Sequence, residues 1–142
     1  MAVSYFLKGF NCAQSVLLAM CEHWEIKSDL IPKVATAFGG GIGGCGSVCG
    51  ALTGGVMALG MEFGTNEPSA KERMKSYKLA QKLCKQFEKQ NGTMLCRDLV
   101  HYDLSNPKEL EKAREAGVFE NKCTLFVKSA VEILLEITGN SH

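Results

Sequence analysis

A glycine-rich, uncharged stretch over residues 39–64 constrains this chain more than any other sequence feature. It contains 11 of the 15 glycines, and its first charged residue is Glu62. Glycine loses more backbone entropy on ordering than any other residue, so this density is unfavourable unless the backbone must approach another group closely. Because Cys45 and Cys49 lie inside the stretch, we infer that the close approach serves sulfur chemistry.

The length and composition predict one helical domain spanning residues 1–142. At 142 residues and 46% hydrophobic content, a chain buries roughly two thirds of its unfolded surface and needs no disulfide or metal to fold. The seven cysteines are therefore not explained as staples of a small scaffold. A net charge of +1 provides no global field that would attract nucleic acid, so we expect no nucleic-acid partner.

The cysteine content also bears on the cellular compartment. Seven is an odd number, so a complete disulfide framework would leave one cysteine unpaired. Residues 17–21, LLAMC, resemble a lipoprotein cleavage box, but Asn11, Cys12 and Gln14 interrupt the apolar region before it. We therefore expect a cytoplasmic protein, where thiols stay reduced and clustered cysteines are more often redox-active or metal-binding.

A run of 28 uncharged residues, from Val34 to Met61, is long enough to raise the question of a membrane span. Residues 39–46 contain too many glycines to hold a helix, however. Irregular backbone is not tolerated against lipid. We therefore expect no membrane span, and a loop over residues 39–47.

Capping residues and apolar periodicity predict an all-α fold. Asn11 with Gln14 and Ser69 with Glu72 have the spacing of capping boxes, and no segment shows the alternation of a strand. Ser47, Thr93 and Asn106 are the expected caps of three further helices. The predicted helices cover residues 3–8, 12–24, 32–38, 48–63, 70–90, 94–100 and 107–117, and a last one runs from Asn121 or Lys122 to Gly139. We expect a single-domain bundle of five or six helices.

The predicted helix over residues 48–63 has an unusual surface. Its apolar stripe consists of Cys49, Leu52, Val56, Leu59 and Phe63, and glycine and alanine occupy most of its other positions. A helix with such small side chains lets its neighbours approach closely. We therefore expect it at the centre of the bundle, and its small-residue surface also favours a homodimer.

The predicted helix over residues 70–90 carries two stripes. The expected inner stripe consists of Ala70, Met74, Tyr77, Ala80, Cys84 and Phe87. The second stripe contains six lysines, Lys71, Lys75, Lys78, Lys82, Lys85 and Lys89. Such a stripe is typical of a solvated helix face. Its functional alternative is a docking surface for an acidic redox protein partner.

Four cysteines, Cys12, Cys49, Cys96 and Cys123, each fall in the first turn of a different predicted helix. Free backbone amides and the helix dipole favour an anion there, so the thiol pKa can fall below its ordinary value. At least three of the four lie on or beside an apolar stripe. We therefore expect the four thiols to point inward and to meet at one site.

The other three cysteines have different expected roles. Cys21 and Cys84 are interpreted as small buried hydrophobic residues. Cys45 lies four residues before Cys49, where it can resolve a disulfide with Cys49 or serve as a spare ligand. His101 and Arg97 lie close to Cys96 in sequence and are candidates to activate its thiol, or they are solvated surface residues.

The run Cys49-Gly50-Ala51-Leu52-Thr53-Gly54, a CGAxxG motif, resembles the centre of the C_GCAxxG_C_C family, whose members are regarded as redox-active. The family's name places the glycine before the cysteine, and here their order is reversed. The segment around Cys12 is similar to the family's first cysteine, and Cys96 and Cys123 are similar to its last two. The resemblance covers essentially the whole chain and implies a redox role for these four residues. It also implies that an iron–sulfur cluster is possible, since a similar arrangement occurs in a cluster-binding module of multidomain cytochromes.

Two chemistries fit the four thiols. Pairs of thiols can cycle between dithiol and disulfide, as in an oxidoreductase. Alternatively, all four bind an iron–sulfur cluster or a zinc ion, for which four thiolates are suitable ligands. A third possibility is a small-anion or nucleotide site in the glycine-rich loop, because Gly39, Gly41 and Gly44 match a GxGxxG pattern. The dinucleotide-binding motif follows a strand, and no strand is predicted before that loop.

Overall fold

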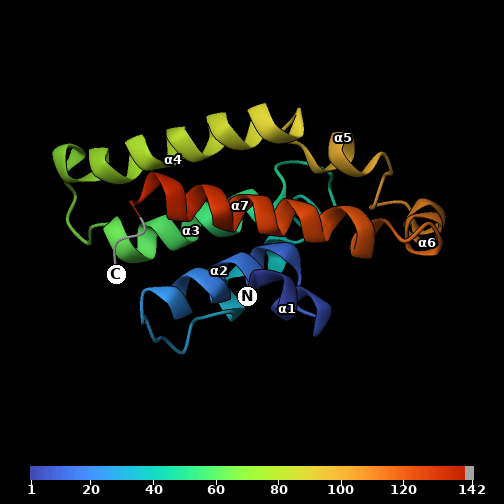
Figure 1. The fold of residues 1–142 in the computed structure, drawn as a ribbon, viewed down its shortest axis with the longest axis horizontal. Helices are drawn as coiled ribbons and strands as arrows, with labels where there is room; N and C mark the ends of the chain where they lie inside the picture. The colour runs from blue at the N-terminus through green and yellow to red at the C-terminus, as the bar shows by residue number, and fades with distance from the viewer. Residues whose placement is uncertain (140–142) are drawn as a thin grey trace.

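The computed structural model describes residues 1–139 and is an all-α bundle, as predicted (Figure 1). Its α-helices are α1 (Ala2–Leu7), α2 (Cys12–His23), α3 (Gly50–Phe63), α4 (Ala70–Asn91), α5 (Cys96–Val100), α6 (Pro107–Glu115) and α7 (Thr124–Ile137). A 3-10 helix, η1 (Lys33–Phe38), precedes the glycine-rich loop, and a π-helix, η2 (Phe119–Cys123), leads into α7. Residues 1–139 contain no β-strand, and one isolated antiparallel bridge joins Val48 and Leu95.

Local capping interactions begin the helices near the predicted residues. Asn11 and Gln14 form the complete capping box of α2, with the Asn11 side chain accepting from the Gln14 N–H at 2.9 Å. The predicted box at Ser69 is only half made. The Ser69 hydroxyl accepts from the Glu72 N–H, but the Glu72 carboxylate accepts from the Thr65 hydroxyl at 2.8 Å instead of reaching back. The prediction of the capping residue is therefore confirmed, and that of its reciprocal partner is wrong.

Helix α3 lies inside the bundle, in contact with α2, α4 and α7. A Cβ atom at Gly54 would lie 2.4 Å from the Ala13 carbonyl oxygen, so only glycine permits the observed approach of α2 and α3. Ala51 and Ala58 are completely buried. Val56, assigned to the inner stripe, is instead 38% exposed, because the small-residue faces pack inward in its place.

The N-terminal half of α4 departs from the prediction. Met74 is 43% exposed and Tyr77 is 53% exposed, although periodicity placed both on the inner stripe. The buried residues of α4 are Leu83 and Phe87, both in its C-terminal half. Apolar periodicity identifies a face that can be buried, but a neighbouring element must be present to cover it.

The lysine stripe of α4 faces solvent along its whole length. Across residues 1–139, the one ion pair joins Arg114 to Glu111 at 3.9 Å, so none of the six lysines is neutralised by an ion pair with this part of the chain. Lys75 lies over the Phe63 ring, 4.8 Å from its centroid. An acidic protein partner and a homodimer both remain predictions.

The long uncharged run is divided among η1, the glycine-rich loop and the 14-residue helix α3. Over residues 1–139, no helix combines the length and the hydropathy that crossing a bilayer requires.

Candidate four-cysteine site

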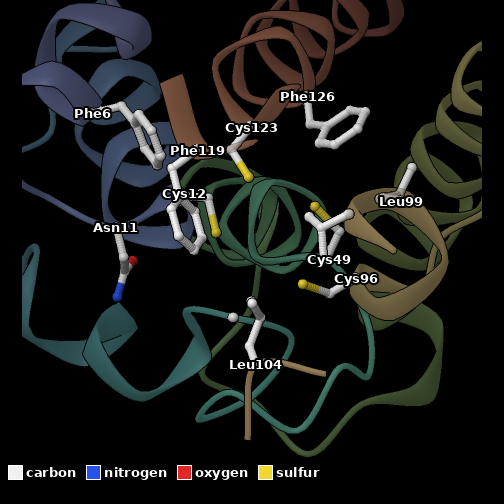
Figure 2. Close-up of a pocket in the computed structure, with 12 residues that line it drawn as sticks. Phe6, Asn11, Cys12, Cys49, Cys96, Leu99, Leu104, Phe119, Cys123 and Phe126 are labelled. Atoms are coloured by element: carbon white, nitrogen blue, oxygen red, sulfur yellow. The ribbon is translucent and has the colours of Figure 1, made fainter. Parts of the chain in front are cut away.

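The side chains of Cys12, Cys49, Cys96 and Cys123 line one cavity of about 100 Å³. Figure 2 shows their sulfur atoms directed toward a common space. The other lining residues are mostly apolar: Phe6, Asn11, Gly40, Leu99, Val100, Leu104, Phe119 and Phe126. The structure thus brings together four residues that are at least 27 positions apart in sequence.

Cys12 is the first residue of α2, as predicted, and it owes its position to the capping box before it. The Asn11 side chain also donates to the Thr36 carbonyl at 2.8 Å, and the Gln14 amide donates to the Thr36 hydroxyl at 3.1 Å. These bonds fasten the start of α2 to η1. They also satisfy Asn11, the one polar side chain other than the thiols in the cavity lining.

A short backbone ladder holds Cys49 and Cys96 near each other. The Cys49 N–H donates to the Met94 carbonyl at 2.8 Å, and the Cys96 N–H donates to the Ser47 carbonyl at 2.7 Å. The Val48–Leu95 bridge lies between these two bonds. The segment before α3 and the segment before α5 are therefore paired like two antiparallel strands.

The two helix starts differ in detail from the prediction. Cys49 itself is the N-cap of α3, so Ser47 does not cap this helix. Cys96 is the first residue of α5 and not the third. The Thr93 hydroxyl, predicted to cap α5, accepts from the Leu95 N–H at 3.1 Å and stabilises the turn before the helix. In both cases the backbone ladder delays the start of the helix.

Cys123 does not occupy the first turn of a helix, which corrects the prediction. It is the last residue of the π-helix η2, which continues directly into α7. π-turns are rare and are frequently found at functional sites. Here the π-turn and the first turn of α7 place Phe119, Cys123 and Phe126 along the same cavity.

The site lies where two hydrophobic clusters meet. The main core contains Cys49, and Cys12 packs against it. A separate cluster, here called the α5–α6 cluster, contains Cys96, Val100, Leu104, Ala113 and Val118, with Tyr102, Leu110, Phe119 and Cys123 packed against it. Two of the four thiols therefore come from each cluster. Any group that binds all four thiols would link the two hydrophobic clusters.

Burial raises the pKa of all four thiols, which corrects the expectation of lowered values. It raises the pKa of Cys96 to about 11 and that of Cys123 to about 12, with the nearby Cys12 thiol adding to both shifts. Backbone amides of Ala13, Gly40 and Gly50 act to lower the pKa of Cys12, but burial outweighs them. At Cys12 and Cys49 the backbone amides therefore act in the predicted direction, but their effect on the pKa is smaller than that of desolvation.

The remaining cysteines lie outside the cavity lining. Cys21 is buried in the main core and Cys84 is half-buried against it, in agreement with their interpretation as hydrophobic residues. Cys45 is exposed and lies in an outer polar recess with Arg97 and His101. Arg97 donates to the Cys45 and Gly46 carbonyls, both at 3.2 Å. The role of Arg97 in the fold is thus to hold the loop before α3.

The glycine-rich loop forms a left-handed coil. Five consecutive residues, 40–44, have positive φ angles between 57° and 79°, a conformation that only glycine adopts without strain. The six consecutive backbone N–H groups from Ile42 to Ser47 donate to carbonyls within the segment 37–42. These six amides are occupied within the loop and are not available to a phosphate. The small-anion or nucleotide site remains a prediction.

Sequence reasoning did not identify the apolar residues that enclose the thiols. The signal was present as helical spacing, because Leu99 and Val100 follow Cys96 by three and four residues. Phe119 precedes Cys123 by four residues, and Phe126 follows it by three. Residues at these spacings share a helix face, so a cysteine that faces a cavity predicts its neighbours in the lining.

The fold and the site define a small all-α protein with four thiols at one apolar cavity. The chain belongs to the family described as "Putative redox-active protein (C_GCAxxG_C_C)", whose sequence model matches residues 10–137. An uncharacterised protein of Archaeoglobus fulgidus is 30% identical over 134 residues, which cover 88% of this chain and 82% of the relative. No solved structure matches the chain.

Proposed function

We propose that the four cysteines bind an iron–sulfur cluster and that the protein transfers electrons through it. One observation carries the proposal: four free thiols line a cavity of about 100 Å³ that is otherwise almost entirely apolar. A bound group that fills this cavity would cover its apolar lining and stabilise the folded state.

The donor set fits such a cluster. Cys12, Cys49, Cys96 and Cys123 would supply four thiolates, which is the usual ligand set of [2Fe–2S] and [4Fe–4S] clusters. When bound, a cluster supplies one-electron redox chemistry at a potential that depends on burial and on hydrogen bonds to sulfur. The phenylalanine and leucine side chains of the lining would keep water away from the sulfur atoms.

A single zinc ion fits less well. With Zn–S bonds of about 2.3 Å, a tetrahedral site requires sulfur atoms within about 4 Å of one another. Among residues 1–139, no three His, Cys, Asp or Glu side chains are arranged to hold a metal ion. Several irons hold their ligands farther apart than one ion does, so this result counts against zinc and not against a cluster.

The raised pKa values of the thiols agree with metal ligation. Near neutral pH the empty site holds protonated thiols, because burial disfavours the thiolate. Metal cations bound by these thiols would supply the compensating charge, and their binding would release the thiol protons. The affinity for metal should therefore increase with pH through the range in which these protons are released.

Thiol–disulfide exchange is the second candidate, and the ladder beside Cys49 and Cys96 favours it. Oxidation of two thiols to a disulfide releases two electrons and two protons, which reduce a partner disulfide to two thiols. The limited exposure of Cys49 and Cys96, 5% and 7%, restricts access by a protein disulfide. For this reason we place exchange behind cluster binding.

The decisive experiment is iron and sulfide analysis, with a visible spectrum, on protein purified and reconstituted without oxygen. We expect iron, acid-labile sulfide and cluster absorption bands, all lost in Cys49→Ser and Cys123→Ser. Cys45→Ser is the matched control, because Cys45 is exposed and outside the cavity lining, and it should retain the cluster. Colourless wild-type protein after reconstitution would contradict cluster binding. A reversible two-electron couple in that protein would then establish exchange.

A further inference from the structure

The first residue of α3 has no side chain, and the Cys12 sulfur occupies the space where one would lie. A Cβ atom at Gly50 would be 2.3 Å from the Cys12 Sγ, far inside van der Waals contact. The Phe38 carbonyl oxygen and the Ala13 nitrogen would be at 3.1 Å and 3.2 Å. Gly50 therefore meets a thiol before it meets any other group.

The backbone of Gly50 does not itself require glycine. It lies in α3 with right-handed helical geometry, and its φ is not among the positive values of the chain. Alanine is a better helix former than glycine, so helix propensity does not account for glycine here. The absence of a side chain at position 50 thus needs a reason other than conformation.

The other glycines of α3 have different neighbours. A Cβ atom at Gly54 would meet the backbone of Ala13, and one at Gly55 would meet the Leu83 and Leu134 side chains. A Cβ atom at Gly60 would meet nothing within 4 Å. Gly50 is the α3 glycine whose missing side chain makes room for a thiol of the site.

We propose that Gly50 is a positioning residue. Because Gly50 has no side chain, the Cys12 sulfur can lie against the start of α3, and the order Cys49-Gly50 leaves this space free. Any side chain at position 50 would place a Cβ atom in the space that the Cys12 sulfur occupies and would displace that sulfur. The proposal concerns the metal-free protein, and its consequence for a bound cluster rests on the proposed function.

The position of the Cys12 sulfur beside Gly50 has a chemical consequence. This sulfur lies beside the starts of two helices, α2 and α3, whose first amides carry partial positive charge. The backbone N–H groups of Ala13, Gly40 and Gly50 act on this thiol. Hydrogen bonds to a ligating sulfur tune the potential of a cluster. The missing side chain at Gly50 thereby keeps the Cys12 sulfur within reach of these amides.

The test compares Gly50→Ala with Gly60→Ala, each in the wild-type and in the Cys12→Ala background. These four variants and their two parents, the wild type and Cys12→Ala, are kept reduced and metal-free, and the six thermal midpoints are measured. We expect Gly50→Ala to lower the midpoint in the wild-type background and to have no such effect once the Cys12 sulfur is absent. Gly60→Ala should not lower the midpoint in either background. If Gly50→Ala does not fold, folding of the double variant supports the same conclusion.

A second measurement follows the thiol itself. Alkylation of each cysteine by iodoacetamide is timed by mass spectrometry of the metal-free protein. We expect Gly50→Ala to increase the rate at Cys12 several-fold relative to Gly60→Ala, with smaller changes at Cys96 and Cys123. In protein that has bound an iron–sulfur cluster, the reduction potential of the cluster should shift in Gly50→Ala and stay unchanged in Gly60→Ala.

Two results would overturn the proposal. One is an equal loss of thermal midpoint for Gly50→Ala in both backgrounds, which would assign the conflict to Phe38 and Ala13. The other is an unchanged alkylation rate at Cys12. Failure of the wild-type protein to bind iron and sulfide would remove the proposed function, but it would leave both metal-free measurements intact, so the two failures are distinguishable.

Discussion

The backbone N–H of Cys96 donates a hydrogen bond of 2.7 Å to the carbonyl of Ser47. This bond pairs the segment before α5 with the segment before α3, and the bond from Cys49 to Met94 extends the pairing. Each such bond contributes about 1 kcal/mol. Two of the four thiols are therefore positioned by main-chain atoms, before any ligand binds.

Arg97 should contribute to stability by holding the same loop. Its guanidinium donates to the Cys45 and Gly46 carbonyls, so Arg97→Ala should lower the free energy of unfolding by about 1 kcal/mol in urea titrations. Arg97→Lys should not restore it, because lysine cannot reproduce the guanidinium fork.

Arg114→Ala is the control. Arg114 forms an ion pair of 3.9 Å at a site 61% exposed, and its loss should change stability by less than about 0.5 kcal/mol. Equal effects of the two alanine substitutions would refute this role for Arg97.

Binding of an iron–sulfur cluster by the four cysteines should hold the α5–α6 cluster against the main core, since each of these two hydrophobic clusters provides two thiols. A ligand that binds only the folded state adds stability that grows with its concentration relative to Kd. Hydrogen exchange in peptides covering α5 and α6 should therefore be slower, by roughly tenfold or more, in loaded than in metal-free protein. Peptides from the N-terminal half of α4 serve as the internal control. Identical exchange of α5 and α6 in both forms would contradict the prediction.

The left-handed loop contains one residue that is not glycine. Ile42 has a φ of 66° and is 42% exposed, and an L-residue in this conformation is strained by about 1–2 kcal/mol. Ile42→Gly should therefore raise the free energy of unfolding by about 1 kcal/mol. The reverse change, Gly43→Ala, places a side chain at a φ of 57° with its nearest contact at 3.9 Å, and it should lower stability by a similar amount. Chemical denaturation checks both signs, and a shift of both variants in the same direction would rule out backbone strain as the cause.

Stability of the metal-free protein should fall in alkaline solution, partly through Cys21. Burial, with the Glu62 carboxylate adding to it, raises the pKa of Cys21 from 9.0 to about 11. Because the thiol has the higher pKa in the folded state, the contribution of Cys21 to stability is complete below about pH 9 and is lost as the pH rises toward about 11. Urea unfolding across this pH range should show that the free energy of unfolding decreases less steeply with pH in Cys21→Ala than in the wild type. Cys45→Ala, which removes an exposed thiol, should decline as the wild type does, and parallel curves for all three proteins would argue against a raised pKa at Cys21.

Much of the helical framework was predictable because its signals are local. Asn11, Ser69 and Asn106 cap the helices that they were expected to begin, and Gly92 ends α4 with a left-handed residue. These interactions join residues two to four positions apart, so the sequence contains both partners. The prediction was less accurate at Cys49 and Cys96, where hydrogen bonds between distant segments decide the first helical residue.

The site itself divides in the same way. The sequence alone determined which residues are chemically able to form a four-thiol centre. It placed all four at helix starts, which is correct for Cys12, Cys49 and Cys96. Only the tertiary structure decided that all four face one cavity, that Met74 and Tyr77 of α4 remain uncovered, and that burial outweighs the helix dipole at the thiols. Capping and periodicity act within a few residues, whereas convergence, exposure and desolvation depend on which elements pack together. For that reason the packing of two hydrophobic clusters, and not the spacing of the cysteines, sets the properties of this site.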